Sequence, residues 1–420
     1  MVLPLVISIA VVLAILGIGL IQLGYGSQLM AVLGTSGITA RAAADAGVAD
    51  ALYRMNEAFI YGTGPGPLPP DVSGQPLNNA IASYSYQVSG PLSGSGPEPY
   101  WLIRSTGTSG REIRTVYART GIRNLFDYAL IVTDKLVLKA GTLVDWYDSD
   151  VGYPSPGAYN LKIGTNSIIS PPAGGIDLGT GSIVRGDVLV GMGGDPDYVI
   201  REGGGGAITG LRYSLPEPFV FQQIVPPSSY AATMTLGGAD LEIVAPPGYT
   251  FENPYPVLTS EISIGQGGRL TVVGPVALRV TGDMSFGQAA ELYVGDPNVP
   301  PGEPGFVPSS LDIYLDGNLY GQNAGGINNL SEIPGYFKLF GTGPPYQQWD
   351  IKNSRTFYGV YYGPNADIII RADADVFGSV SGHSYEMKNS GNMHYDVQLS
   401  DWGAYDVGFE IERWWEVVGP

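Results

Sequence analysis

Hydrophobic residues dominate the beginning of the chain. The stretch Met1–Leu23 is almost wholly apolar, and no charged side chain occurs before Arg41. A helix of that length and apolarity can cross about 30 Å of hydrocarbon. The pattern therefore predicts a membrane-inserted stage in the life of the protein.

The apolar stretch continues into a segment with helical spacing and charged pairs one turn apart. The apolar positions are Val48, Leu52, Met55 and Phe59, and the pairs are Arg41 with Asp45 and Asp50 with Arg54. Such spacings place each set on one face of a helix. We expect one helix over residues 1–61, which ends where Gly62-Thr63-Gly64-Pro65 interrupts the backbone ladder.

Alternation of apolar and polar residues replaces the helical spacing after a Gly/Pro-rich linker at residues 62–79. It is clearest at 84–88 and 100–117, and it predicts a small antiparallel sheet over residues 80–124. From residue 125 onward, short apolar runs separated by Gly, Asn, Asp and Pro predict a series of short strands. The spacing of these runs suits a sandwich, a barrel or an irregular solenoid, and periodicity alone does not choose among them.

The amino-acid composition of the chain argues against several classes of function. The chain has 39 acidic and 21 basic residues and a net charge of −18, so it is a poor partner for nucleic acid. It has no cysteine, which excludes disulfides, thiolate metal sites and a thiol nucleophile. The two histidines, His383 and His394, are too few for a multi-histidine metal centre.

The N-terminal segments Met1-Val2-Leu3-Pro4-Leu5 and Ala40-Arg41-Ala42-Ala43-Ala44-Asp45-Ala46-Gly47 resemble type IV pilins and minor pilins. The resemblance implies cleavage of a leader before Met1 by a prepilin peptidase, handling by inner-membrane assembly machinery, and polymerisation into a helical filament of identical subunits. The family usually has Glu at the position of Leu5. This departure leaves open whether the chain is a major or a minor subunit.

Assembly without that glutamate requires the apolar helix itself to set the register of the filament. Small residues allow close helix packing, and glycines weaken a helix by about 1 kcal/mol each. The candidate assembly residues are Met1, Pro4, Leu5, Ala10, Ala14, Gly17, Gly19, Gly24 and Gly26.

A second resemblance covers roughly residues 125–400. The segments that carry it include Gly186-Asp187-Val188-Leu189-Val190-Gly191, Tyr314-Leu315-Asp316-Gly317-Asn318 and Phe357-Tyr358-Gly359-Val360-Tyr361-Tyr362-Gly363-Pro364-Asn365-Ala366-Asp367. They look like the right-handed β-helical domain attached to pilin-like stems in bacterial surface proteins. The expected fold class is therefore mainly β, with a long N-terminal helix, a small antiparallel sheet and a right-handed β-helix, or solenoid, at 125–400. Residues 401–420 form a last strand or cap.

Candidate chemistry is sparse. Asp145, Asp148 and Asp150 offer oxygen ligands for calcium, but they lack the EF-hand pattern, and a solvated turn is the better interpretation. His394 and Asp396 lie two residues apart on a predicted strand and share a face, which favours a structural hydrogen bond. We therefore expect no catalytic residue and no cofactor.

These patterns favour a non-catalytic structural subunit of an extracellular, pilus-like filament at the cell surface, after a membrane-inserted precursor. One alternative is a tip adhesin that presents the body to glycans or surfaces. Another is a membrane-anchored β-helical enzyme that cleaves polysaccharides, because β-helical folds include such enzymes. The closing segment 409–418 alternates like a strand, and its Trp414-Trp415 pair caps the body or docks on a neighbour in these interpretations.

Overall fold

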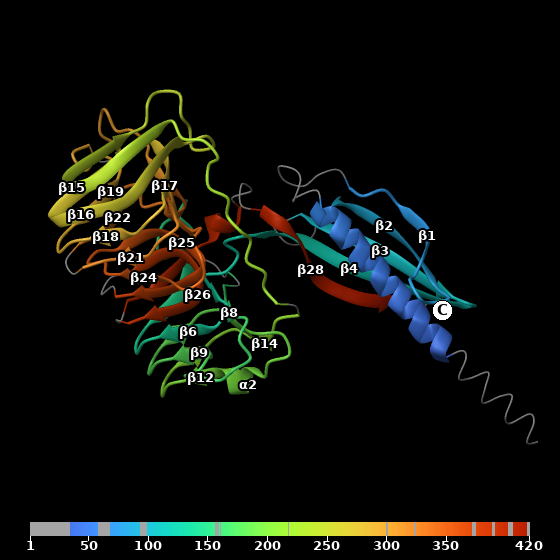
Figure 1. Ribbon diagram of the computed structural model, residues 1–420. Helices are drawn as coiled ribbons and strands as arrows, with labels where there is room; N and C mark the ends of the chain where they lie inside the picture. The colour runs from blue at the N-terminus through green and yellow to red at the C-terminus, as the bar shows by residue number, and fades with distance from the viewer. Residues whose placement is uncertain are drawn as a thin grey trace, which may run out of the picture. The chain divides into compact units, whose positions relative to one another are not determined.

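The computed structural model describes residues 34–57, 68–92, 99–155, 159, 161–216, 218–299, 301–322, 325–371, 375–388, 391–401 and 406–417. The chain divides into two compact units (Figure 1). The first comprises Met1–Asn124 and Asp406–Pro420, and the second comprises Leu125–Tyr405.

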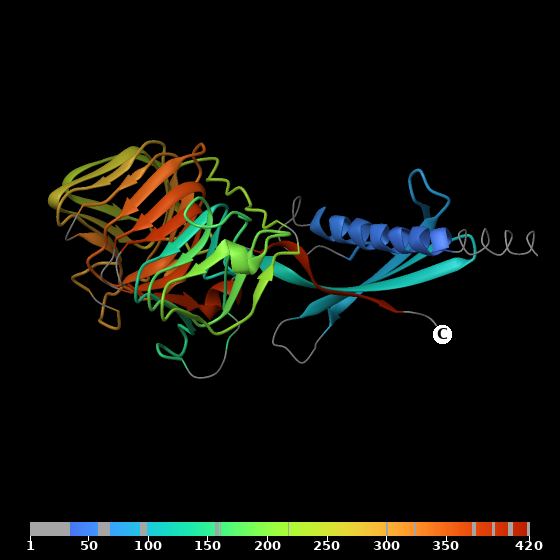
Figure 2. The same cartoon turned by 90° about the horizontal axis from the view of Figure 1, so that it is seen from below.

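The first unit is a helix on an antiparallel sheet. The helix covers residues 34–57 and lies across one face of the sheet in both views (Figures 1 and 2). The sheet has the order β1-β2-β3-β4-β28, and every pairing in it is antiparallel. Its strands are β1 (Val72–Pro76), β2 (Ser83–Leu92), β3 (Tyr100–Ser109), β4 (Glu112–Asn124) and β28 (Asp406–Val417).

The helix and the sheet bury a shared apolar core. Alternate residues of each strand face the helix, as the period of two requires. The core consists of Ala44, Val48, Ala51 and Met55 from the helix, with Tyr86, Val88, Trp101, Ile103, Val116, Ala118 and Phe409 from the sheet. The helical spacing read from the sequence therefore corresponds to the face that packs on the strands.

Two glycines allow the helix to approach the sheet closely. A Cβ atom on Gly107 would lie 2.0 Å from the carbonyl oxygen of Ala40 and 2.4 Å from the amide nitrogen of Ala44. A Cβ atom on Gly47 would lie 2.2 Å from the hydroxyl oxygen of Ser105. The helix backbone thus rests directly on β3, where only glycine fits.

The C-terminal strand β28 is tied to the helix by polar contacts. Asn56 donates its side-chain amide to the carbonyl of Phe409 at 3.1 Å and accepts the Phe409 amide at 2.5 Å. Arg41 pairs with Glu416 and lies 4.6 Å above the ring of Trp414. The segment that the sequence suggested as a cap or docking element is therefore the fifth strand of the small sheet, beside β4.

The predicted helix over 1–61 is described only in part. Residues 34–57 are helical, whereas 1–33 and 58–67 lie outside the described residues. Within the part of the chain that the structure describes, no helix combines the length and the apolarity needed to span a membrane.

Among its described residues, the second unit consists of parallel strands with one helical turn, α2 (Pro196–Val199), and two 3₁₀ turns, η1 (Pro334–Tyr336) and η2 (Val397–Asp401). Its strands belong to a single 23-stranded sheet. They are β5 (Leu130–Val132), β6 (Lys135–Leu138), β7 (Leu143–Tyr147), β8 (Lys162–Thr165), β9 (Gly175–Leu178), β10 (Ile183–Val184), β11 (Asp187–Val190), β12 (Ile200–Glu202), β13 (Ala207–Ile208), β14 (Arg212–Ser214), β15 (Ala232–Val244), β16 (Tyr255–Val273), β17 (Pro275–Val280), β18 (Met284–Phe286), β19 (Glu291–Val294), β20 (Ser310–Leu315), β21 (Leu319–Tyr320), β22 (Gly326–Asn329), β23 (Phe337–Gly341), β24 (Gln347–Ile351), β25 (Phe357–Ile370), β26 (Val376–Met387) and β27 (Met393–Asp396).

The strand pairings of this unit form a closed circuit. β16 pairs with β17 along one part of its length and with β18 along another, while β25 pairs with both β23 and β24. The circuit β16-β17-β20-β23-β25-β24-β21-β18 thus returns to its start as a closed, barrel-like ring of 8 parallel strands.

The expected right-handed β-helix, a solenoid whose rungs follow one another in chain order over 125–400, is therefore wrong. The ring closes through the long strands β16 and β25, and the sheet places β27 next to β5 rather than at an end. β26 and β27 pair with the early strands β5, β6 and β7. Alternation along a strand determines which side chains face inward, but it does not determine which strand pairs with which.

Residues 218–231 are part of the connection from β14 to β15 and run along the second unit (Figure 1). Phe219 exchanges hydrogen bonds with the side chain of Asn166 at 2.8 and 2.7 Å, and its ring meets that of Tyr128 edge-on at 5.2 Å. Farther along, the hydroxyl of Tyr362 donates to the carbonyl of Gln222 at 2.8 Å. This segment therefore bridges strands that lie far apart in the sheet order.

Candidate functional site

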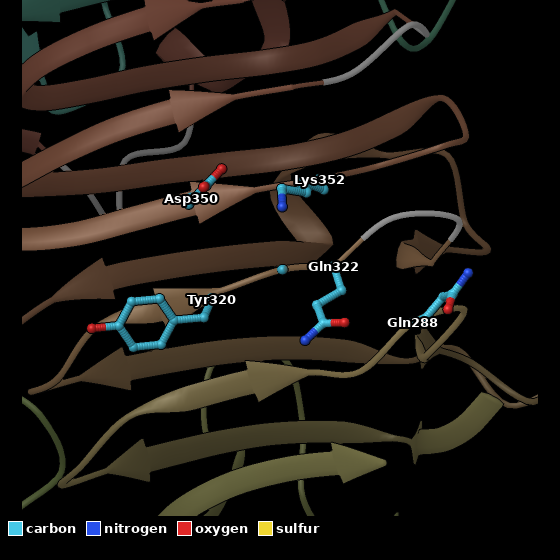
Figure 3. A pocket seen from close by; sticks show the side chains of 6 residues that line it. Gln288, Tyr320, Gln322, Asp350 and Lys352 are labelled. Atoms are coloured by element: carbon cyan, nitrogen blue, oxygen red, sulfur yellow. The ribbon is translucent and has the colours of Figure 1, made fainter. Parts of the chain in front are cut away.

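A polar hollow lies on the outer face of the second unit (Figure 3). Its volume is about 460 Å³. The residues that line it are Gln288, Tyr320, Gly321, Gln322, Asp350 and Lys352. Side chains from three consecutive rows of the parallel sheet thus meet in one surface depression.

Strand register sets the positions of these side chains. Tyr320 of β21 stands opposite Asp350 of β24. The neighbours of these residues, Leu319 and Trp349, are 1% and 0% exposed, so the alternation of the strands turns Tyr320 and Asp350 outward. Tyr320 is 44% exposed, and its ring presents a face toward the viewer in Figure 3.

The charges of the hollow are unequally compensated. Asp350 accepts a hydrogen bond from Nε of Arg371 at 2.7 Å, which neutralises its carboxylate. Lys352 lines the hollow, and among the described residues its ammonium has no acidic partner within ion-pair distance. Gln288 and Gln322, which carry side-chain amides, also line the hollow (Figure 3). The site therefore offers one uncompensated positive charge beside several neutral hydrogen-bonding groups.

A smaller hollow adjoins the first and shares Gly321, Gln322 and Lys352 with it. Its wall includes Asn353, which is 4% exposed. The side-chain oxygen of Asn353 has no hydrogen-bond partner among the described atoms. A buried amide oxygen without a partner is costly in a folded protein, and it marks a position where a donor would be stabilised.

The three aspartates suggested as calcium ligands do not converge. Asp145 accepts hydrogen bonds from the hydroxyl of Tyr153 at 3.2 Å and pairs with His394. Asp148 accepts from the backbone amide of Asp150 at 2.9 Å and from the side chain of Gln398 at 2.9 Å. Within the described ranges, no three His, Asp or Glu residues cluster as metal ligands would. Asp148 instead organises the local turn, and Asp145 joins β7 to β27.

His394 and Asp145 form a buried pair between β27 and β7. The ring nitrogen Nδ1 of His394 lies 2.5 Å from Oδ1 of Asp145, and the two residues are 1% and 4% exposed. The rings of Tyr153 and Phe377 pack against the imidazole at 4.3 and 4.5 Å. Because the pair is enclosed, it holds the neighbouring strands β27 and β7 together. The sequence expected a structural hydrogen bond for His394, but with Asp396 on the same strand; its partner lies instead across the sheet.

Asp396 accepts hydrogen bonds from the backbone amides of Ser149 at 3.1 Å and Gln398 at 3.2 Å, both through Oδ1. Burial raises the pKa of its carboxyl above the ordinary value, and the two amides partly oppose that shift. A raised pKa means that the folded state binds the proton more tightly than the unfolded state. Stability from this group is therefore present at acid pH and is lost as pH rises through the folded pKa.

We expect Asp396→Asn to be as stable as the parent protein, or more stable, at pH 7, because asparagine keeps the accepting oxygen and removes the buried charge. The advantage should shrink when both proteins are melted at pH 4. Asp396→Ala should instead cost about 1–3 kcal/mol at either pH, because two amides lose their acceptor. Circular dichroism melting at the two pH values tests this, with Asp150→Asn as the exposed control. An Asp396→Asn variant that is less stable at pH 7 than at pH 4, relative to the parent, would contradict it.

The candidate assembly residues, from Met1 to Gly26, all lie outside the described residues. The residues of the polar hollow were not singled out from the sequence. One available signal was the alternation Gln348-Trp349-Asp350-Ile351-Lys352, which predicts Asp350 and Lys352 on the outward face. That signal could not reveal Tyr320 and Gln288 as neighbours, because they come from strands whose pairing the sequence left open.

Comparisons with known proteins give little more. Residues 257–402 match a domain of unknown function, DUF7305, which covers less than half of the chain. No curated protein matches. Among solved structures, the competence-associated pilin ComZ from Thermus thermophilus is similar at 13% identity with a TM-score of 0.22, over 91% of this chain and 98% of that chain. A TM-score this low carries no argument about fold or function.

Proposed function

We propose that this protein is a non-catalytic structural subunit of an extracellular, pilus-type filament. The observation that supports it most is the organisation of the first unit, in which the helix at 34–57 packs on a five-stranded antiparallel sheet whose last strand is the C-terminal strand β28. The apolar, uncharged sequence from Met1 to Ala40 precedes and enters this helix. A helix anchored by a folded head and continued by an apolar segment suits polymerisation through that segment.

Burial of apolar surface stabilises the proposed filament once its subunits have left the bilayer, relative to exposure of the same surface to water. Each fully buried Val, Leu or Ile contributes about 1.5–3 kcal/mol, and Met1–Leu23 consists mostly of such residues. Transfer of the segment from the bilayer to a bundle of identical helices keeps it out of water throughout. The two folded units would then form the outer part of the filament. Prepilin peptidase and inner-membrane assembly proteins are the partners that this function requires.

The contact between helix and sheet supports the proposal because several kinds of interaction hold the helix on the sheet. The helix is held by the apolar core, by the two hydrogen bonds between Asn56 and Phe409, and by the ion pair between Arg41 and Glu416. The polar contacts join the helix at 34–57 to the strand β28. A load applied to the N-terminal segment therefore passes into the sheet rather than into a single strand.

Electron microscopy of the sheared extracellular fraction, with mass spectrometry of the filaments, tests the proposal. We expect uniform fibres composed of this chain. Ala14→Leu with Gly17→Leu should abolish fibres, because bulky residues prevent close helix packing. Tyr198→Ala, on an exposed residue of the second unit, is the matched control and should leave them intact. Parent cells whose shaft lacks the chain would refute the structural role, and a tip position would favour the adhesin alternative.

A further inference from the structure

The polar hollow around Tyr320 combines groups that suit a sugar. Its one aromatic side chain, Tyr320, is 44% exposed and offers a ring face beside polar groups (Figure 3). Aromatic faces supply contact area for the apolar face of a sugar ring at small entropic cost. An isolated exposed tyrosine is common on protein surfaces, so the inference depends on the other residues that line the hollow.

Hydrogen-bonding groups line the same hollow as the ring (Figure 3). Gln288 and Gln322 supply amide donors and acceptors, and Asp350 supplies a carboxylate that is already held by Arg371 at 2.7 Å. An amide or carboxylate can exchange hydrogen bonds with several hydroxyls at once. The Arg371 contact fixes Asp350 in place, so that this acceptor is ordered before a ligand arrives.

The charge of Lys352 indicates which kind of sugar fits. Lys352 lines both hollows, and within the described part of the chain its ammonium pairs with no carboxylate. This is notable in a protein of net charge −18, where acidic residues greatly outnumber basic ones. A carboxylate on the ligand would provide the missing counter-charge.

We propose that this surface binds an acidic polysaccharide, with a sugar ring against Tyr320, the ligand carboxylate at Lys352, and sugar hydroxyls on Gln288, Gln322 and Asp350. Binding goes beyond the structural role and does not require it, since the hollow lies wholly within the second unit. A filament built of such subunits would display one saccharide site on each copy.

Isothermal titration of the full-length chain in detergent micelles with tetragalacturonate and with maltotetraose tests the proposal. We expect the parent protein to bind tetragalacturonate and to bind maltotetraose at least tenfold more weakly. Tyr320→Ala and Lys352→Gln should each raise the Kd for tetragalacturonate about tenfold. Tyr198→Ala, at a tyrosine that is 61% exposed and outside the hollow, should leave the Kd unchanged.

Two controls, the salt dependence of binding and a check of folding, distinguish loss of the ionic contact from loss of structure. Added salt should weaken binding by the parent more than by Lys352→Gln, because the variant lacks the ionic contact. Far-ultraviolet circular dichroism should be the same for all variants. Absence of tetragalacturonate binding, equal affinity for the two ligands, or parent-like affinity in both hollow variants would overturn the proposal. Because micelle-bound chains are titrated, a failure to form filaments would not affect the result.

Discussion

Gly107→Ala should destabilise the first unit by about 3 kcal/mol or more. The added methyl group would overlap the carbonyl oxygen of Ala40 at 2.0 Å and the amide nitrogen of Ala44 at 2.4 Å. Both are backbone atoms, so no side-chain rotation relieves the overlap, and overpacking of this kind costs about 1–3 kcal/mol or more. The helix would have to lift from β3 and would lose contact with the apolar core beneath it.

Hydrogen exchange read by mass spectrometry measures this effect locally. Amides of the helix at 34–57 should exchange about a hundredfold faster in Gly107→Ala, whereas strands of the second unit should not change. The matched control is Gly34→Ala in the same helix, since a Cβ atom there meets nothing within 4 Å. Equal helix protection in the two variants would show that the close approach at Gly107 is not required.

Asp312→Ala should destabilise the second unit by about 3–5 kcal/mol. Asp312 and Lys338 stand opposite each other on β20 and β23, 9% and 5% exposed, with 2.7 Å between Oδ1 and Nζ. The ammonium also donates to the carbonyl of Gly335 at 2.7 Å. Removal of the carboxylate leaves a buried charge without a counter-ion, which is among the most costly single changes in a protein interior.

Two further variants separate charge from packing in this pair. Asp312→Leu combined with Lys338→Met should recover most of the loss, because an apolar pair of similar volume removes both charges together. Asp177→Ala breaks the exposed pair with Arg201 between β9 and β12, and it should cost less than about 1 kcal/mol. Thermal melting of all three variants followed by near-ultraviolet circular dichroism compares them. A double variant as unstable as Asp312→Ala would show that the ion pair is not the source of the effect.

The helix and the first hairpin could be predicted from the sequence because they depend on residues that are close together along the chain. The spacing of Val48, Leu52 and Met55 places them on one helix face, and Val48 and Met55 are buried on the sheet while Leu52 packs at its margin. The alternation at 100–117 produces β3 and β4, paired antiparallel through a tight turn. These features depend on neighbours a few residues away, which a single sequence displays directly.

The sequence did not predict which strands pair when they lie far apart along the chain. β28 joins β4 rather than capping the body, because its apolar face, including Phe409, completes the core under the helix. The ring of parallel strands closes through β16 and β25, which are 19 and 14 residues long and can each pair with several strands. A strand of alternating residues accepts many neighbours equally well, so its choice depends on the packing of the whole unit.

The sequence alone determined the apolar N-terminal segment, the amphipathic helix that follows it, the small antiparallel sheet and the series of short strands, because each rests on periodicity or composition within one stretch of chain. Only the tertiary structure decided that Asp145 pairs with His394, that Lys338 is buried against Asp312, and that Tyr320 meets Asp350 and Lys352 in one hollow. Those contacts join residues on separate strands. Their formation depends on strand order and register. Both arise from the packing of many strands at once, so neither can be predicted from the residues of a single strand.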